Sequence, residues 1–169
     1  MGAFKRSLFQ MNVYVKNFKR FNTYSDLYNK EAYELELDCY YRLSKYKNFP
    51  SLIDYNSKDL TITLEHCGVT VRHIKDNNGI INKKALTNIK NIITALQTED
   101  IVHLDFKAKN PKNLCYKDPN IFLIDFDVAI IDKNPLNSKL NHWYQKWLKH
   151  GGYNHFERQL EKCIKEFIK

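Results

Sequence analysis

Hydrophobic and polar positions in the early part of the chain predict a strand, a helix and a hairpin. Residues 13–15, VYV, form a short β-prone run. Between residues 25 and 50, apolar side chains recur at roughly helical spacing until a proline closes the segment. Two further apolar runs, 52–55 and 60–64, flank the polar residues 56–59, and this arrangement is typical of a β-hairpin.

The rest of the pattern is mostly helical. Residues 86–96 place isoleucine and leucine on one helical face, and a loop rich in Lys and Asn follows from 103 to 113. Residues 120–124, NIFLI, indicate a strand that leads into acidic residues. Two amphipathic stretches, 140–148 and 156–167, are separated by a Gly-Gly pair. Strands with one helix, followed mostly by helices, predict an α+β fold, and 169 residues suit one domain.

Composition and charge narrow the class of protein. Hydrophobic residues make up 43% of the chain, which is enough for a buried core and argues against global disorder. The net charge of +8 suits an anionic partner such as a nucleotide, a nucleic acid, a phosphoprotein or a membrane surface. The lysines are scattered and no recognisable nucleic-acid reader motif occurs, so we do not expect nucleic-acid binding.

Other features bear on location. The four cysteines lie far apart without a C-x-x-C pair, which argues against zinc and suits a reducing compartment. The N-terminal residues lack the apolar core of a signal peptide. The longest apolar stretch, 121–131, is interrupted by Asp125 and Asp127, so no membrane span is expected. These features predict a soluble intracellular protein of the cytoplasm or nucleus.

The chemistry concentrates in HLDFKAKN, residues 103–110, and in the DFD that begins at Asp125. Phosphoryl transfer from ATP needs a carboxylate for the attacking hydroxyl and a cation for the terminal phosphate. It also needs an amide oxygen and a second carboxylate to hold Mg²⁺. Asp105, Lys107, Asn110 and Asp125 supply these four groups in that order.

At these residues the sequence resembles the protein-kinase superfamily. HLDFKAKN is similar to the catalytic loop HRDLKPEN, and the first acid of DFD is similar to the magnesium-binding Asp of DFG. The resemblance implies that Asp105 is the catalytic base and that Lys107 contacts the γ-phosphate. It further implies that Asn110 and Asp125 are the magnesium ligands.

The resemblance extends to the nucleotide-positioning residues. Lys16 in VYVKNF is similar to the β3 lysine of kinases, and Glu36 lies where the αC glutamate is expected. In kinases these two side chains pair and position the triphosphate. Lys19 and Glu34 are the competing choices for the same pair.

The implied fold is a miniature bilobal kinase-like domain. Residues 1–66 would form an N-lobe with a small antiparallel sheet and helix αC, and residues 67–169 a truncated helical C-lobe. LEHCG, at the boundary, resembles the kinase hinge, in which backbone groups at Glu65 and Cys67 would bind adenine.

The sequence also departs from the kinase pattern. No glycine-rich G-x-G-x-x-G precedes Lys16, and no A-P-E motif follows the DFD. The strand that usually starts directly after the metal-binding Asn starts after Asn113 instead, so Asn113 is the alternative to Asn110. Asp127 replaces the glycine of DFG, where it would either assist metal binding or be solvated.

These residues predict an ATP- and magnesium-dependent phosphotransferase. A protein Ser or Thr hydroxyl is the first choice of acceptor, because Lys107 follows the base by two positions as in Ser/Thr kinases, and a small-molecule hydroxyl stays open. The alternative is a kinase-mimic binding module that sequesters a true kinase or its substrate. The expected partners are therefore ATP and either a protein substrate or a partner kinase.

Overall fold

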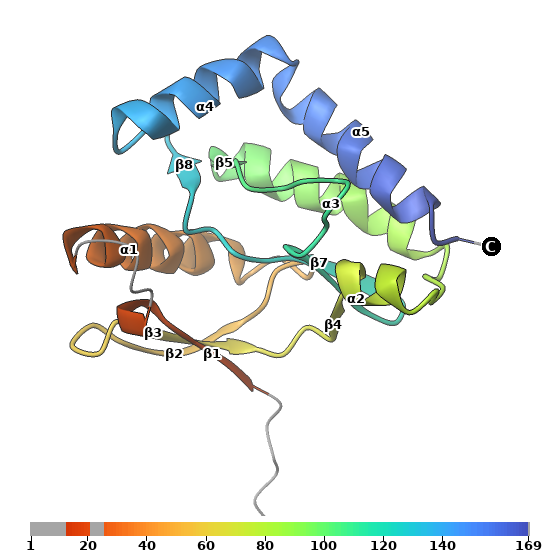
Figure 1. Ribbon diagram of the computed structural model, residues 1–169, viewed down its shortest axis with the longest axis horizontal. Helices are drawn as coiled ribbons and strands as arrows, with labels where there is room; N and C mark the ends of the chain where they lie inside the picture. Colours follow the sequence, from red (N-terminus) through yellow and green to blue (C-terminus); the bar gives the residue numbers. More distant parts are fainter. Residues whose placement is uncertain (1–12, 21–25, 169) are drawn as a thin grey trace, which may run out of the picture.

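The computed structural model describes residues 13–20 and 26–168 and combines helices with small antiparallel sheets (Figure 1). This mixture confirms the α+β class expected from the hydrophobic pattern. The helices are η1 (Phe18–Arg20), α1 (Asp26–Leu43), α2 (Val71–Asp76), α3 (Ala85–Thr98), α4 (Ser138–Lys149) and α5 (Gly152–Lys165). The strands are β1 (Val13–Asn17), β2 (Leu52–Asn56), β3 (Thr61–Glu65), β4 (Val69–Thr70), β5 (Ile101–His103), β6 (Leu114–Lys117), β7 (Asn120–Leu123) and β8 (Ala129–Ile131).

The first sheet has the order β1-β3-β2, and both pairs of strands are antiparallel. This arrangement confirms the predicted strand at 13–15 and the predicted hairpin. Ile62 and Leu64 of β3 point to the buried face, as the two-residue period of a strand requires. Helix α1 lies along this sheet on the side toward the rest of the molecule (Figure 1).

Two smaller sheets carry the second half of the chain. Their orders are β4-β6-β7 and β5-β8, again with antiparallel pairs. The sequence pattern indicated β7 but placed residues 103–113 in a loop, whereas β5 already includes His103. Strands of two to four residues are too short to show a period, so only their pairing in space reveals them.

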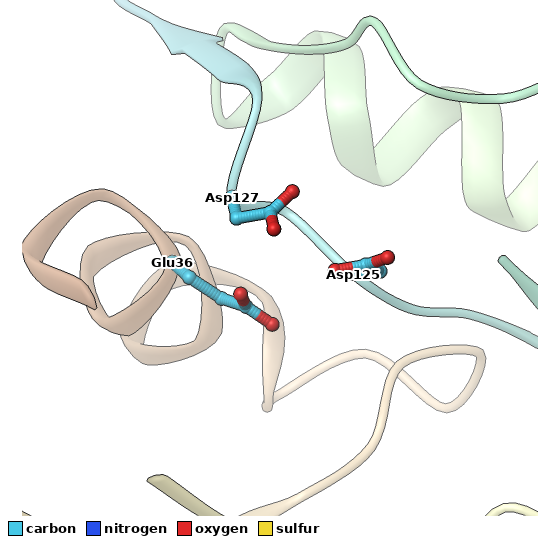
Figure 2. Close-up of side chains that lie close together, drawn as sticks. All are labelled: Glu36, Asp125 and Asp127. Atoms are coloured by element: carbon cyan, nitrogen blue, oxygen red, sulfur yellow. The ribbon is translucent and has the colours of Figure 1, made fainter. Parts of the chain in front are cut away.

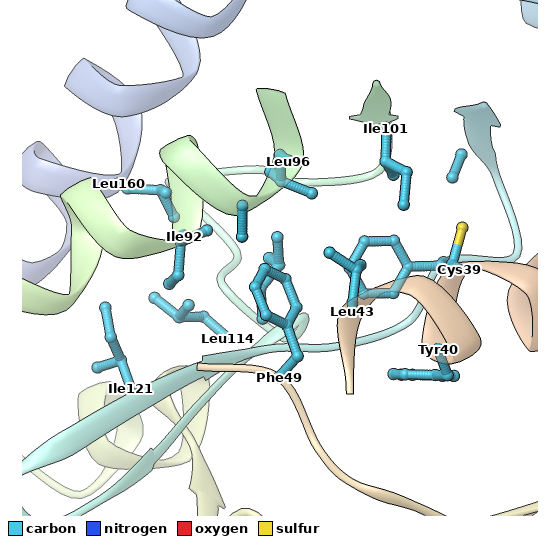
Figure 3. Close-up of a cluster of buried hydrophobic side chains, with 14 of the residues drawn as sticks. Cys39, Tyr40, Leu43, Phe49, Ile92, Leu96, Ile101, Leu114, Ile121 and Leu160 are labelled. Carbon is cyan, nitrogen blue, oxygen red and sulfur yellow. The ribbon is translucent and has the colours of Figure 1, made fainter. Parts of the chain in front are cut away.

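The core forms around α3, whose isoleucines and leucine face inward as predicted. Ile89, Ile92 and Leu96 are at most 1% exposed, and Ile92 and Leu96 lie near Leu160 of α5 and the strands of the second half (Figure 3). Burying each such side chain stabilises the fold by about 1.5–3 kcal/mol. The two predicted C-terminal helices are confirmed as α4 and α5, and α5 packs on α3.

A close backbone approach holds the junction between the β1-β3-β2 sheet and the helical half. Gly68 follows β3 and has a φ of +86°, and a Cβ on it would lie 2.1 Å from the carbonyl oxygen of Tyr116. Only glycine fits this position without moving β6. A second link is made by Arg42 of α1, which donates to both carboxylate oxygens of Asp132, at 2.9 and 3.0 Å, just after β8. The two halves are therefore joined at two separate places.

Within residues 13–20 and 26–168, no helix combines the length and apolar character needed to cross a bilayer.

Candidate functional site

A pocket of about 490 Å³ lies where the β1-β3-β2 sheet meets the second half of the chain. Its walls come from β1, α1, the end of β3, the loop before β6 and the loop after β7. The residues that line it are Tyr14, Lys16, Glu36, Tyr40, Pro50, Leu64, Glu65, His66, Cys67, Gly68, Thr70, Lys112, Asn113, Cys115, Ile124, Asp125 and Asp127. Seven of the residues singled out from the sequence thus reach one cavity: Lys16, Glu36, Glu65, Cys67, Asn113, Asp125 and Asp127.

A buried ion pair joins β1 to α1 inside the pocket. The Lys16 Nζ lies 2.6 Å from the Glu36 Oε2, and the side chains are only 8% and 1% exposed. Strand alternation explains why Lys16 faces inward, because its neighbour Val15 is exposed. The competing residues lie on the surface: Lys19 is paired with Asp59, and Glu34 with Lys30.

Two carboxylates from the loop after β7 approach the same ammonium group. Lys16 Nζ lies 2.5 Å from Asp125 Oδ1 and 3.5 Å from Asp127 Oδ2. Figure 2 shows the Glu36 side chain reaching from α1 toward the loop that carries both aspartates. Carboxylate oxygens of Glu36, Asp125 and Asp127 all lie within 4.8 Å of one another. One cation therefore faces three carboxylates.

The electrostatics of this cluster follow from burial and crowding. Burial raises the pKa of Glu36 to about 7, because the attraction of Lys16 does not outweigh desolvation and the charge of Asp125. The pKa of Asp127 is also raised, chiefly by burial. The charge of Asp125 adds to this increase, and the charge of Lys16 opposes it. Burial alone would lower the pKa of Lys16, but the three carboxylates outweigh it and raise that pKa, so Lys16 stays charged. The surplus of negative charge makes the cluster suitable for a divalent cation, whose preferred hard ligands are oxygens.

The backbone at Asp125 is strained and held from two sides. Asp125 has a φ of +70°, a conformation that costs a residue with a Cβ about 1–2 kcal/mol. Its N–H donates to the Tyr40 hydroxyl at 3.2 Å. The next residue, Phe126, is fully buried and meets Tyr40 edge to face with ring centroids 5.6 Å apart. Such strain is commonly retained at functional sites, and here it directs the Asp125 carboxylate into the pocket.

Asp105 lies in the loop after β5, beside the pocket residues Lys112 and Asn113. The Asn113 Nδ2 donates to the backbone carbonyl of Asp105 at 3.2 Å and to its Oδ2 at 3.1 Å. Lys112 and Lys107 approach the Oδ2 and Oδ1 at 3.3 and 3.4 Å. Partial burial raises the pKa of Asp105, but the hydrogen bond from Asn113 and the charges of Lys112 and Lys107 together lower it. Asp105 is therefore ionised at neutral pH.

The structure treats the two candidate asparagines differently. Asn110, the first choice from its five-residue offset to Asp105, is exposed and accepts a hydrogen bond from Arg72 Nη1 at 3.1 Å. It does not line the pocket. Asn113 is 2% exposed, lines the pocket and bonds to Asp105. The start of β6 explains the difference, because Asn113 directly precedes this strand whereas Asn110 lies three residues earlier in the loop.

The segment expected to bind adenine, residues 65–68, also lines the pocket. The Glu65 N–H donates to Ser51 O at 2.9 Å, and the Cys67 thiol contacts the Glu65 carbonyl at 3.5 Å. Cys67 is 5% exposed, and burial raises the pKa of its thiol to about 12, so it stays protonated. The backbone of this segment thus borders the cavity while its thiol is unreactive.

Two residues that line the pocket, Tyr40 and Lys112, were not predicted from the sequence. Tyr40 lies four residues after Glu36, and this spacing already puts both side chains on one side of α1. Lys112 was not considered, and its position next to Asn113 was the available signal. Lys107, which the sequence did suggest, is 68% exposed and does not line the pocket.

Comparison of the chain with models of protein families, and with curated proteins, gives no match.

Proposed function

We propose that this protein is an ATP- and magnesium-dependent phosphotransferase with a miniature bilobal, protein-kinase-like fold. A single observation carries the proposal. Lys16 is held between Glu36 and Asp125 in the same pocket as Asn113, the residue that bonds to Asp105. Lys16, Asp125 and Asn113, from segments far apart in the chain, line one cavity, and Asp105 lies beside it. These are groups that phosphoryl transfer requires.

Each group has a proposed role. Lys16, oriented by Glu36, contacts the inner phosphates of the nucleotide. Asp125 and Asn113 hold Mg²⁺, and Asn113 replaces Asn110 in this role because its Nδ2 is engaged by Asp105 and its Oδ1 remains as an acceptor. The bound ion would neutralise charge on the phosphates. Asp105, ionised and close to the pocket, accepts the proton of the attacking hydroxyl.

The nucleotide base fits the other end of the pocket. Leu64 and Cys115 are buried apolar residues that border the cavity. Their position beside the 65–68 segment suits a flat, apolar base whose edge bonds to backbone groups at Glu65 and Cys67. The proposed acceptor is a Ser or Thr hydroxyl of a protein.

The test is magnesium-dependent transfer from labelled ATP to generic protein acceptors or to the protein itself. Asp105→Ala and Asp125→Ala are each expected to lower the rate by about 10²-fold or more. Asp54→Ala serves as the matched control, because Asp54 is exposed on β2 away from the pocket. Transfer that persists in both pocket variants would contradict the proposal.

Two measurements on the unaltered chain distinguish the enzyme from a kinase-mimic binding module. A kinase-mimic module would show no transfer in the unaltered chain and no thermal stabilisation by Mg²⁺ with ATP. The enzyme is expected to show both, and Asp125→Ala is expected to abolish the magnesium-dependent part of the stabilisation.

A further inference from the structure

Two lysines flank Asp105, and only one of them reaches the pocket. Lys107 and Lys112 lie 3.4 and 3.3 Å from the two carboxylate oxygens of Asp105. Lys112 lines the cavity, whereas Lys107 does not. The side chain of Lys107 is also the more exposed of the two, at 68% against 54%. The two ammonium groups are therefore at similar distances from Asp105, but only that of Lys112 is placed to contact a ligand in the pocket.

The loop backbone explains why Lys112 reaches the cavity. Pro111 and Asn113, on either side of it, are buried. The N–H of Lys112 donates to Asn110 O at 2.8 Å, which closes a tight turn. With both neighbours anchored in the protein, the exposed side chain between them extends over Asp105. Residues 111–113, between Asn110 and the start of β6, thus bring both Lys112 and Asn113 to the pocket.

Charge at the pocket gives this lysine a function. Among the described residues that line the cavity, Lys16 and Lys112 are the two lysines. Lys16 is already engaged by the buried Glu36 carboxylate at 2.6 Å and the partly buried Asp125 carboxylate at 2.5 Å. Among the described residues, the ammonium group of Lys112 pairs with Asp105 alone, and such half-exposed pairs are weak enough to rearrange. A polyanionic chain that starts at Lys16 and extends toward Asp105 would end next to Lys112.

We infer that Lys112, rather than Lys107, is the lysine that contacts the terminal phosphate of the bound nucleotide. This inference rests on the proposed function. It makes Lys112 a residue that discriminates the triphosphate from the diphosphate and that neutralises charge on the group being transferred. Lys107 then remains an exposed neighbour of Asp105.

The test compares affinity for ATP and for ADP, each with Mg²⁺, by isothermal titration calorimetry. Lys112→Ala is expected to weaken ATP binding about tenfold and to leave ADP binding within about twofold, because only ATP has the third phosphate. Lys107→Ala is expected to keep the difference between the two nucleotides. Lys109→Ala, an exposed lysine of the same loop, is the matched control. Lys112→Arg keeps the charge and is expected to restore most of the preference for ATP.

The outcomes separate the two proposals. If the unaltered chain binds neither nucleotide, the proposed function fails, and this inference with it. If the unaltered chain binds ATP, three results overturn the inference alone. These are an equal loss of ATP and ADP affinity in Lys112→Ala, no loss in that variant, or a loss of the ATP preference in Lys107→Ala. Thermal unfolding of each variant checks that the fold is retained.

Discussion

The two ends of the pocket hold their charged groups in different ways. Around Lys16, the ammonium group and the Glu36 carboxylate are almost completely buried and lie 2.6 Å apart. Around Asp105, the two lysines are more than half exposed and lie 3.3 and 3.4 Å from the carboxylate. The first arrangement is fixed by packing of η1 and β3 against α1. The second is a loop whose half-exposed lysines can change partners.

This difference teaches how stability and chemistry are divided. A buried ion pair is costly to break because the remaining charge has no water to solvate it. An exposed pair contributes at most about 1 kcal/mol and leaves its side chains free to meet a ligand. We therefore expect substitutions at the Lys16 end to affect folding, and substitutions at the Asp105 end to affect activity with little change in folding.

The largest expected loss of stability comes from removing Lys16 from the buried ion pair. Lys16→Met removes the cation from among three carboxylates and is expected to lower the free energy of unfolding by about 3 kcal/mol. Urea denaturation without nucleotide or divalent cations measures this change. Lys19→Met, which removes an exposed lysine 3.5 Å from Asp59, is the control and should change stability by less than about 1 kcal/mol. Asp105→Asn should likewise cost less than about 1 kcal/mol, and a loss as large as that of Lys16→Met would remove the contrast between the two ends.

A smaller effect is expected at the junction between the halves. Gly68→Ala combines a φ of +86° with a Cβ that would lie 2.1 Å from a backbone oxygen, so we expect a loss of at least about 2 kcal/mol in urea denaturation. Gly151→Ala is the matched control, since its φ is +101° but the nearest side-chain atoms to an added Cβ are 3.8 Å away. It should show the backbone strain alone, about 1–2 kcal/mol. Equal losses in the two variants would mean that the close approach to Tyr116 does not matter.

The smallest expected effect is a pH dependence of stability that comes from His103. This residue ends β5, just before the loop that carries Asp105, and contacts the backbone just before Asp125. Its Nε2 lies 3.0 Å from the Ile124 carbonyl, and burial lowers its pKa although that carbonyl and nearby carboxylates oppose the change. Because the folded-state pKa lies below the unfolded value of about 6.5, this histidine stabilises the fold above about pH 6.5. The contribution is lost as the pH falls from about 6.5 toward the folded pKa.

Comparison with a variant isolates this contribution. The raised pKa of Glu36, about 7, acts in the opposite direction, because its stabilisation is present at low pH and is lost as the pH rises through 7. His103→Gln retains the Glu36 contribution and removes the imidazole. We expect the stability of the unaltered chain to fall relative to that of His103→Gln by up to about 1.4 kcal/mol per pH unit below pH 6.5. Parallel stability curves for the two proteins would contradict the assignment.

The sequence by itself determined the longer elements and the residue types of the site. The helical period fixed α3, α4 and α5, and the β-branched run fixed β3, because these patterns repeat over enough residues to be recognised. Asp125 could be chosen from its place at a strand end, whereas Lys16 and Glu36 were implied only by the resemblance to kinases, with Lys19 and Glu34 as competing choices. Their assembly in one pocket agrees with that choice.

Only the tertiary structure decided which of two similar residues reaches the pocket. Asn110 and Asn113, or Lys107 and Lys112, belong to one irregular loop in which no period relates sequence position to direction. Burial of Pro111 and Asn113 and the start of β6 set that direction. The short strands β4, β5 and β8 likewise depend on partners far along the chain. Local sequence encodes local periodicity, whereas contacts between distant segments determine which side chains of a loop converge.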